Sequence, residues 1–279
     1  MEGAIASTGS GTPAIWNVKD DDTNIDILGT VHILKPELNW ITPEIGSIID
    51  NAQIIVIETD LESPEATNEI SKLMLDKGLF YDGQSLTSVM RDQDKADFLN
   101  YLKNNKIPLS IIEDFKPWYA AITISLEQIA TAGYDLNSGV EKVILKRVKA
   151  NKVDLAYLET AKDQLGILGD MEMEQQIEFL MSSVHIGEKG VKMFDLLVSE
   201  WAEGDTKGLA LLMSNETMMS EAVYDAFLIN RNKKWVPQIK SMLEEKKGNI
   251  LIAVGAAHLV GKDSVISLLR DEGYKVSGP

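Results

Sequence analysis

Two histidines occupy equivalent positions in the sequence, each three residues after a glycine that ends an apolar run. The run at residues 25–28 leads into Gly29-Thr30-Val31-His32, and the run at residues 250–254 leads into Gly255-Ala256-Ala257-His258. Side chains that follow parallel strands converge at the carboxyl edge of an α/β sheet. Neutral imidazole is the commonest nitrogen ligand of divalent transition metals. The repeated pattern therefore predicts that His32 and His258 share one metal ion.

Two glutamates also follow apolar runs. Glu58 comes after residues 54–57, and Glu159 comes after residues 155–158. A carboxylate is costly to bury unless it binds a cation or accepts hydrogen bonds, and the alternative is a glutamate that caps the next helix or reaches solvent. We predict Glu58 as the third metal ligand and Glu159 as a general base or fourth ligand.

Two imidazoles and one carboxylate leave a coordination position open for water. This ligand set suits zinc, manganese, cobalt or ferrous iron, and such a metal makes water a usable nucleophile near neutral pH. Arg231 and Asn232 lie on a predicted helix, where a guanidinium could orient a glutamate or bind a substrate carboxylate. His185 lacks a comparable setting, and we expect it on an exposed helix face or loop.

Composition excludes several other classes of function. The formal net charge of −16 disfavours nucleic acids and anionic membrane surfaces as partners. The absence of cysteine excludes thiolate zinc sites, disulfides and cysteine nucleophiles, and no apolar stretch reaches the roughly 20 residues of a membrane span. The small, polar residues 1–13 have no secretion signal, so we expect a cytoplasmic protein, or a periplasmic or secreted one if a leader has been removed.

Apolar runs and turn residues predict the secondary structure. Proline after Thr42 and Ser63 marks two helix starts, at residues 43 and 64, with ends near residues 51 and 78. A further amphipathic helix is expected at residues 139–150, and a long helical stretch at 172–245 with breaks near 187–190 and 204–208. Strands are expected at residues 25–28, 54–58, 153–159 and 250–254, followed by a helix at 263–271 and an edge strand at 274–276.

Strands that alternate with helices indicate an α/β fold with a mainly parallel sheet and helices on both of its faces. The long helical middle region is expected to form a cap, and the order histidine, glutamate, glutamate, histidine suggests pseudo-two-fold halves. We predict a disordered tail at residues 1–14 and a single domain at residues 15–279.

From about residue 15 to residue 276, the order of short motifs resembles the TraB/GumN family, which includes the Tiki proteases and is related to the ChaN-like and erythromycin-esterase-like folds. The motifs that carry the resemblance are Gly29-Thr30-Val31-His32, Val56-Ile57-Glu58-Thr59-Asp60, Lys116-Pro117-Trp118, Gly139-Val140-Glu141, Leu158-Glu159-Thr160, Arg231-Asn232 with Trp235, and Val254-Gly255-Ala256-Ala257-His258-Leu259.

The resemblance implies a metal-dependent peptidase that favours manganese or cobalt. It maps the two Gly-x-x-His motifs onto Gly29–His32 and Gly255–His258, and the first glutamate of the family onto Glu58. Many relatives have Gly-x-Asp where this chain has Gly139-Val140-Glu141, so Glu141 is one methylene longer. We expect Glu141, Arg231 and Asn232 beside the metal ligands.

Two other functions are consistent with the same residues. The protein could bind or sequester a peptide or small ligand without cleaving it, or it could hydrolyse esters. The expected partner is a peptide or small-molecule substrate, and the oligomeric state is not predicted.

Overall fold

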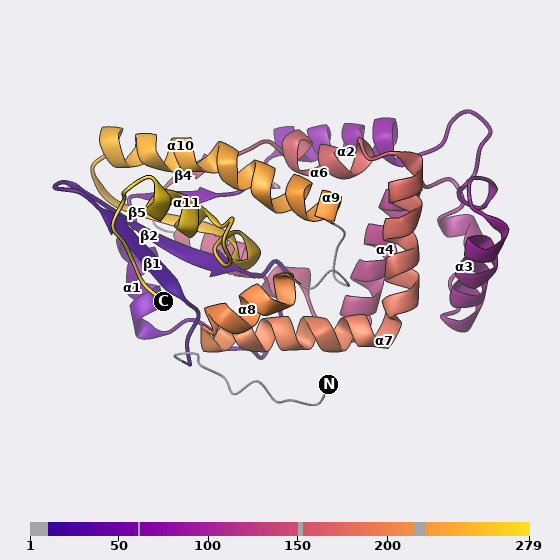
Figure 1. The fold of residues 1–279 in the computed structure, drawn as a ribbon, viewed down its shortest axis with the longest axis horizontal. Coiled ribbons are helices and arrows are strands. Elements are labelled where there is room, and N and C mark those ends of the chain that lie inside the picture. The colour runs from indigo at the N-terminus through magenta and orange to yellow at the C-terminus, as the bar shows by residue number, and fades with distance from the viewer. Residues whose placement is uncertain (1–10, 61, 150–152, 215–220) are drawn as a thin grey trace. The chain divides into compact units, whose positions relative to one another are not determined.

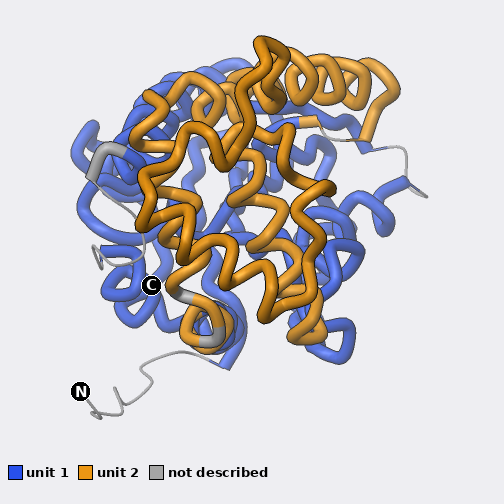
Figure 2. Tube along the Cα trace, turned by 90° about the vertical axis from the view of Figure 1, so that its right-hand side faces the viewer, with its two compact units in different colours: residues 1–59, 134–158, 194–279 blue, residues 60–133, 159–193 orange. Residues whose placement is uncertain are grey.

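The computed structural model describes residues 11–60, 62–149, 153–214 and 221–279. Most of the predicted tail, residues 1–10, lies outside this range. The chain divides into two compact units (Figure 2): unit 1 comprises residues 1–59, 134–158 and 194–279, and unit 2 comprises residues 60–133 and 159–193. The single domain expected for residues 15–279 stays a prediction.

Unit 1 contains a six-stranded sheet with the strand order β4-β3-β5-β2-β1-β6 (Figure 1). Strands β4, β3, β5 and β2 are parallel, and β1 runs antiparallel to both β2 and β6. The prediction of an α/β fold with a mainly parallel sheet is confirmed. The strands are β1 (Ile15–Lys19), β2 (Thr23–Thr30), β3 (Ile54–Ile57), β4 (Asp154–Tyr157), β5 (Gly248–Gly255) and β6 (Val276–Ser277).

The central strands are apolar because both faces of the sheet are covered. Residues 250–254 of β5 have at most 1% of their surface exposed. The connection through α1 (Pro43–Asn51) crosses the sheet from β2 toward β3. The connection through α11 (Val265–Asp271) crosses it in the opposite direction, from β5 toward β6. Right-handed crossovers in opposite directions place their helices on opposite faces. The helices of unit 1 are α1 (Pro43–Asn51), α5 (Val140–Val148), α8 (Thr206–Met213), α9 (Glu221–Tyr224), α10 (Asn230–Glu245) and α11 (Val265–Asp271).

Local sequence signals set the helix starts. The Thr42 side chain accepts a hydrogen bond from the Ile45 amide at the start of α1, and Ser63 does the same for Ala66 at the start of α2 (Pro64–Gly78). In both helices proline occupies the first turn, where its missing N–H costs nothing. Both predicted starts are confirmed.

Unit 2 is helical and has a core of its own. Its helices are α2, α3 (Asp92–Asn104), α4 (Pro117–Thr131), α6 (Ala161–Gly169) and the first part of α7 (Met173–Glu203), which continues into unit 1. Phe98, Ile124 and Leu180 pack in this core with the other buried side chains. The break predicted near residue 187 is confirmed, because Gly187 has a φ of 45° within α7.

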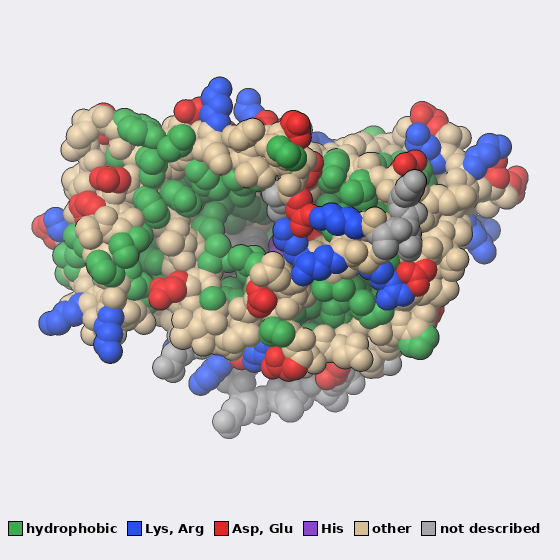
Figure 3. Space-filling model, turned by 180° about the vertical axis from the view of Figure 1, so that it is seen from behind, with side chains coloured by type: hydrophobic (Ala, Val, Ile, Leu, Met, Phe, Trp, Pro, Cys, Tyr) green, Lys and Arg blue, Asp and Glu red, His purple; other side chains and the backbone are tan. Residues whose placement is uncertain are grey.

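No helix among the described residues is both long and apolar enough to cross a membrane. Acidic and basic side chains are interspersed on the face shown in Figure 3. His185 is 57% exposed on α7, as the sequence predicts for a residue without a role in the site.

Candidate active site

The sheet brings the two Gly-x-x-His motifs to the same edge. Strands β2 and β5 are adjacent and parallel, with Thr30 opposite Gly255. Strand β3 lies on the other side of β5, with Ile57 opposite Ala253. His32, His258 and Glu58 therefore all follow the carboxyl ends of three neighbouring strands, as the sequence predicts.

Glu58 is a buried carboxylate with two donors. Its Oε1 accepts a hydrogen bond of 2.6 Å from the Gly255 amide, and its Oε2 accepts one of 2.5 Å from Arg231 Nη2. Burial disfavours the carboxylate, but the charges of Arg231 and His32 and the hydrogen bond from the Gly255 amide hold the pKa of Glu58 below its usual range. Glu58 is therefore ionised at neutral pH. As expected from the sequence for a buried carboxylate, it accepts hydrogen bonds and contacts a cation, Arg231.

His258 is held by both of its ring nitrogens. Nδ1 lies 2.6 Å from Asn232 Oδ1, and Nε2 lies 3.0 Å from Arg231 Nη1. The Asn232 amide group donates to the Asp263 carbonyl, which turns Oδ1 toward the ring. Burial lowers the pKa of His258 to about 3, so the ring is neutral. It follows that Nδ1 carries the proton and that Nε2 offers its lone pair to Arg231.

Arg231 lies between the two groups. The residue is 6% exposed, and its guanidinium contacts Glu58 and His258 and also donates to the Phe227 carbonyl at 3.0 Å. It lies over the Trp235 ring, 4.7 Å from the centroid. The preceding residues Asp225–Ile229 form a π-helical turn, a feature that is frequent at functional sites. The sequence prediction that Arg231 orients a glutamate is in line with this geometry.

His32 belongs to a second, more open group of side chains. Its side chain is 58% exposed, and Nδ1 lies 2.7 Å from Glu141 Oε1. The Thr30 hydroxyl donates to the same carboxylate oxygen. The Glu141 charge raises the pKa of His32 to about 9, which makes the ring cationic at neutral pH. The charge of His32 also acts on Glu58 and lowers the pKa of His258.

A close backbone contact places Glu141 beside His32. The Val140 amide donates to the Val31 carbonyl at 3.0 Å. A Cβ added to Gly139 would lie 2.0 Å from the His32 carbonyl oxygen, which is far inside van der Waals contact. Only glycine lets the chain pass this close, so Gly139 determines where the first carboxylate of α5 lies.

The three remaining predicted residues, Gly29, Gly255 and Glu159, do not share one environment. Gly255 donates to Glu58, and the Gly29 carbonyl accepts a hydrogen bond of 2.8 Å from the Trp201 indole. Glu159 is half-buried and is the first residue of the second segment of unit 2, and Thr160 rather than Glu159 caps α6. The sequence analysis did not predict the contact of Thr30 with Glu141 or that of Trp201 with Gly29. Thr30 could have been found, because residues two apart on an extended chain share a side.

The two histidines at the strand ends have hydrogen bonds of the kind found at histidine metal ligands. In metal sites a histidine ligand commonly donates its other ring N–H to an oxygen, which fixes the tautomer. His258 has this arrangement with Asn232, and His32 has it with Glu141. Among the residues that the structure describes, however, no three His, Asp or Glu side chains are grouped as a ready metal site. The guanidinium of Arg231 instead contacts Glu58 and His258 Nε2.

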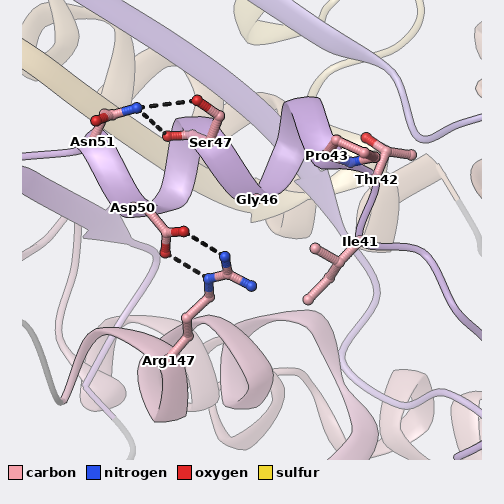
Figure 4. A pocket seen from close by; sticks show the side chains of 8 residues that line it. All are labelled: Ile41, Thr42, Pro43, Gly46, Ser47, Asp50, Asn51 and Arg147. Carbon is pink, nitrogen blue, oxygen red and sulfur yellow. Dashed lines mark hydrogen bonds and ion pairs between the residues drawn. The ribbon is translucent and has the colours of Figure 1, made fainter.

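Elsewhere in unit 1, a groove of about 560 Å³ lies beside α1 (Figure 4). Thr42, Asp50 and Arg147 are among its lining residues, and Arg147 Nε donates to Asp50 at 2.6 Å. None of the predicted site residues lines this groove.

Comparison with protein families identifies the chain. The model of the TraB/PrgY/gumN family matches residues 14–278. The chain belongs to this family. The resemblance seen in the motifs is therefore confirmed, and the TraB/PrgY/gumN match covers all the site residues described above.

Two relatives of this TraB/PrgY/gumN chain are both named "Uncharacterized protein YbaP". One is from Escherichia coli (strain K12) and the other from Shigella flexneri. Each is 18% identical over 258 residues, which is 92% of this chain and 92% of the relative. No solved structure matches the chain.

Proposed function

We propose that this TraB/PrgY/gumN protein is a metal-dependent hydrolase in which His32, Glu58 and His258 hold a divalent transition metal. One observation carries the proposal. Both histidines follow neighbouring parallel strands, and each uses Nδ1 to contact a side-chain oxygen, so that Nε2 is the nitrogen for a ligand role; in His258 this nitrogen contacts Arg231. Manganese, cobalt and zinc suit this mixed nitrogen and oxygen donor set.

A divalent metal at this position would supply Lewis acidity and would activate water near neutral pH. The chain's own groups have supporting roles. Asn232 keeps the proton of His258 on Nδ1, and Glu141 orients His32. Glu141 is also the carboxylate we propose as proton acceptor beside the site, because it lies 2.7 Å from His32 Nδ1 and keeps 15% of its side chain exposed. The general-base role expected for Glu159 stays a prediction from the sequence.

Peptide bonds are the first substrate class to test, because of the resemblance to the Tiki proteases. Ester bonds are the second class. The protein loaded with manganese or cobalt should be incubated with a peptide library and analysed by mass spectrometry. New fragments that depend on metal would support the peptidase proposal, and cleavage of ester substrates alone would move the proposal to ester chemistry.

The metal proposal is tested by metal analysis of the purified protein. His32→Ala and His258→Ala should each abolish both metal retention and turnover. His185→Ala is the matched control, because His185 is exposed on α7 and is assigned no role in the site. Full metal occupancy in either of the first two variants would contradict the proposed ligand set.

A second candidate is a protein that binds a peptide or small ligand without a metal. The observation that favours it is the Arg231 guanidinium, which already satisfies both Glu58 and His258 Nε2. Stoichiometric binding of a peptide without fragments, by protein that retains no metal, would favour this candidate.

A further inference from the structure

We propose that Arg231 is a built-in cation that competes with the metal for Glu58 and His258, so that a metal ion binds only when the guanidinium moves away. This inference rests on the proposed function. It gives Arg231 two effects: this residue sets the metal affinity of the site, and it stabilises the folded protein when no metal is bound.

The contacts of Arg231 involve the atoms that a metal would need. Nη2 lies 2.5 Å from Glu58 Oε2, and Nη1 lies 3.0 Å from His258 Nε2. The lone pair of Nε2 points to Arg231, because Nδ1 carries the proton that is donated to Asn232. A lone pair that accepts a hydrogen bond from Arg231 is not available to a metal at the same time.

Burial makes the presence of a cation in this position necessary. Glu58 is 4% exposed and Arg231 is 6% exposed. A buried carboxylate without a partner is strongly destabilising, so something positive must face Glu58 in the folded protein. Arg231 meets this need without a metal, and a divalent metal would meet it equally well.

The surroundings of Arg231 give it a second set of contacts. The guanidinium lies over Trp235 and donates to the Phe227 carbonyl, and both partners are near it in sequence. Neither contact uses an atom of Glu58 or His258, although the Trp235 ring also packs against the His258 ring with 4.3 Å between the centroids. The side chain can therefore keep part of its binding energy when a metal takes over the carboxylate and the imidazole.

The test replaces arginine with a neutral side chain of similar length. In Arg231→Met the metal no longer has to break two hydrogen bonds, so manganese and cobalt should bind at least about tenfold more tightly than to the wild type. The metal-free variant should unfold at a lower temperature, and addition of metal should raise this temperature by more than it does in the wild type. His185→Ala is the control and should match the wild type in both measurements.

The outcomes separate this inference from the proposed function. If the wild type binds metal and Arg231→Met binds it equally or more weakly, Arg231 supports the site and the inference is overturned, while the proposed function stands. If only Arg231→Met binds metal, the inference is supported and the wild type is not a metal enzyme. If neither protein binds metal, the proposed function and the inference both fail.

A measurement on the wild type covers the case in which Arg231→Met does not fold. The chain contains few arginines, namely Arg91, Arg147, Arg231 and Arg270, so their side-chain signals are simple to assign in ¹⁵N-arginine-labelled protein. Zinc is the suitable diamagnetic probe. Addition of zinc should shift the Arg231 Nη signals and increase their exchange with water, whereas an unchanged and protected Arg231 in zinc-saturated protein would overturn the inference.

Discussion

The close passage of Gly139 over His32 makes a sharp prediction about Gly139→Ala. The φ of Gly139 is −58°, which alanine adopts without strain, so the substitution tests the contact alone. The new Cβ would lie 2.0 Å from the His32 carbonyl oxygen, whereas ordinary contact begins at 3.4 Å. The two segments must therefore separate by roughly 1.4 Å, the difference between these distances.

The size of this shift sets the expected effects. Forcing extra volume into a packed contact costs about 1–3 kcal/mol of unfolding free energy. A shift of about 1.4 Å added to the present 2.7 Å between His32 Nδ1 and Glu141 Oε1 would break that hydrogen bond. Loss of a carboxylate that orients a histidine ligand typically weakens metal binding about 10- to 100-fold.

Urea unfolding and a cobalt titration measure both effects. The control is Gly166→Ala, because the Cβ there would meet only Asp170 Oδ2 at 3.9 Å. Gly166 lies inside α6, where alanine is favoured over glycine, so this variant should be as stable as the wild type or more stable. If Gly139→Ala unfolds and binds cobalt as the wild type does, the claim that this contact positions Glu141 is refuted.

Three further predictions concern the same residues. Asn232→Ala should lower the unfolding free energy by about 1–3 kcal/mol, because the buried Nδ1 proton of His258 loses its acceptor; an unchanged urea midpoint would contradict this. Metal affinity should rise about tenfold per pH unit up to about pH 9, because His32 must lose a proton to bind a metal. A metal affinity that does not change between about pH 6 and 8 would exclude His32 as a ligand. The free energy of unfolding should fall by up to about 5 kcal/mol as the pH drops from about 6.5 toward 3, because His258 is protonated in the unfolded chain but stays neutral in the folded protein. Urea unfolding across this pH range measures the effect, and His258→Asn should reduce it.

Much of the fold follows from local signals in the sequence. The helix starts at Pro43 and Pro64 depend on capping side chains next to them, and capping chemistry is readable from adjacent residues. The apolar runs of β2, β3 and β5 are equally local. The parallel pairing of these strands then follows from the helices between them.

Boundaries and pairings that depend on distant residues were harder to predict. The final edge strand was expected at residues 274–276, and the structure has β6 at Val276–Ser277. Its position is set by hydrogen bonds to β1, an antiparallel strand whose pairing the sequence analysis did not predict. Edge strands carry few buried side chains, so their pattern in the sequence is weak.

In the candidate site, too, local motifs predict some residues, whereas contacts between distant residues could not be predicted. The sequence places His32, Glu58 and His258 at the ends of neighbouring strands, because strand ends and glycine turns are visible in the motifs. It does not predict that Arg231 lies between Glu58 and His258, since Arg231 and Glu58 are 173 residues apart and the side-chain direction depends on how α10 packs. The shared side of Thr30 and His32 is readable from their spacing, but the contact of Thr30 with Glu141, 111 residues away, is not.

The central claim is that His32 and His258 bind one metal ion. Electron spin echo spectroscopy of manganese-loaded protein with ¹⁵N-labelled histidine counts the histidine nitrogens coupled to the metal. We predict two coupled histidine nitrogens in the wild type and in His185→Ala, and no bound metal in His32→Ala and in His258→Ala. A single coupled nitrogen in the wild type, or two in either of the last two variants, would contradict the shared metal site.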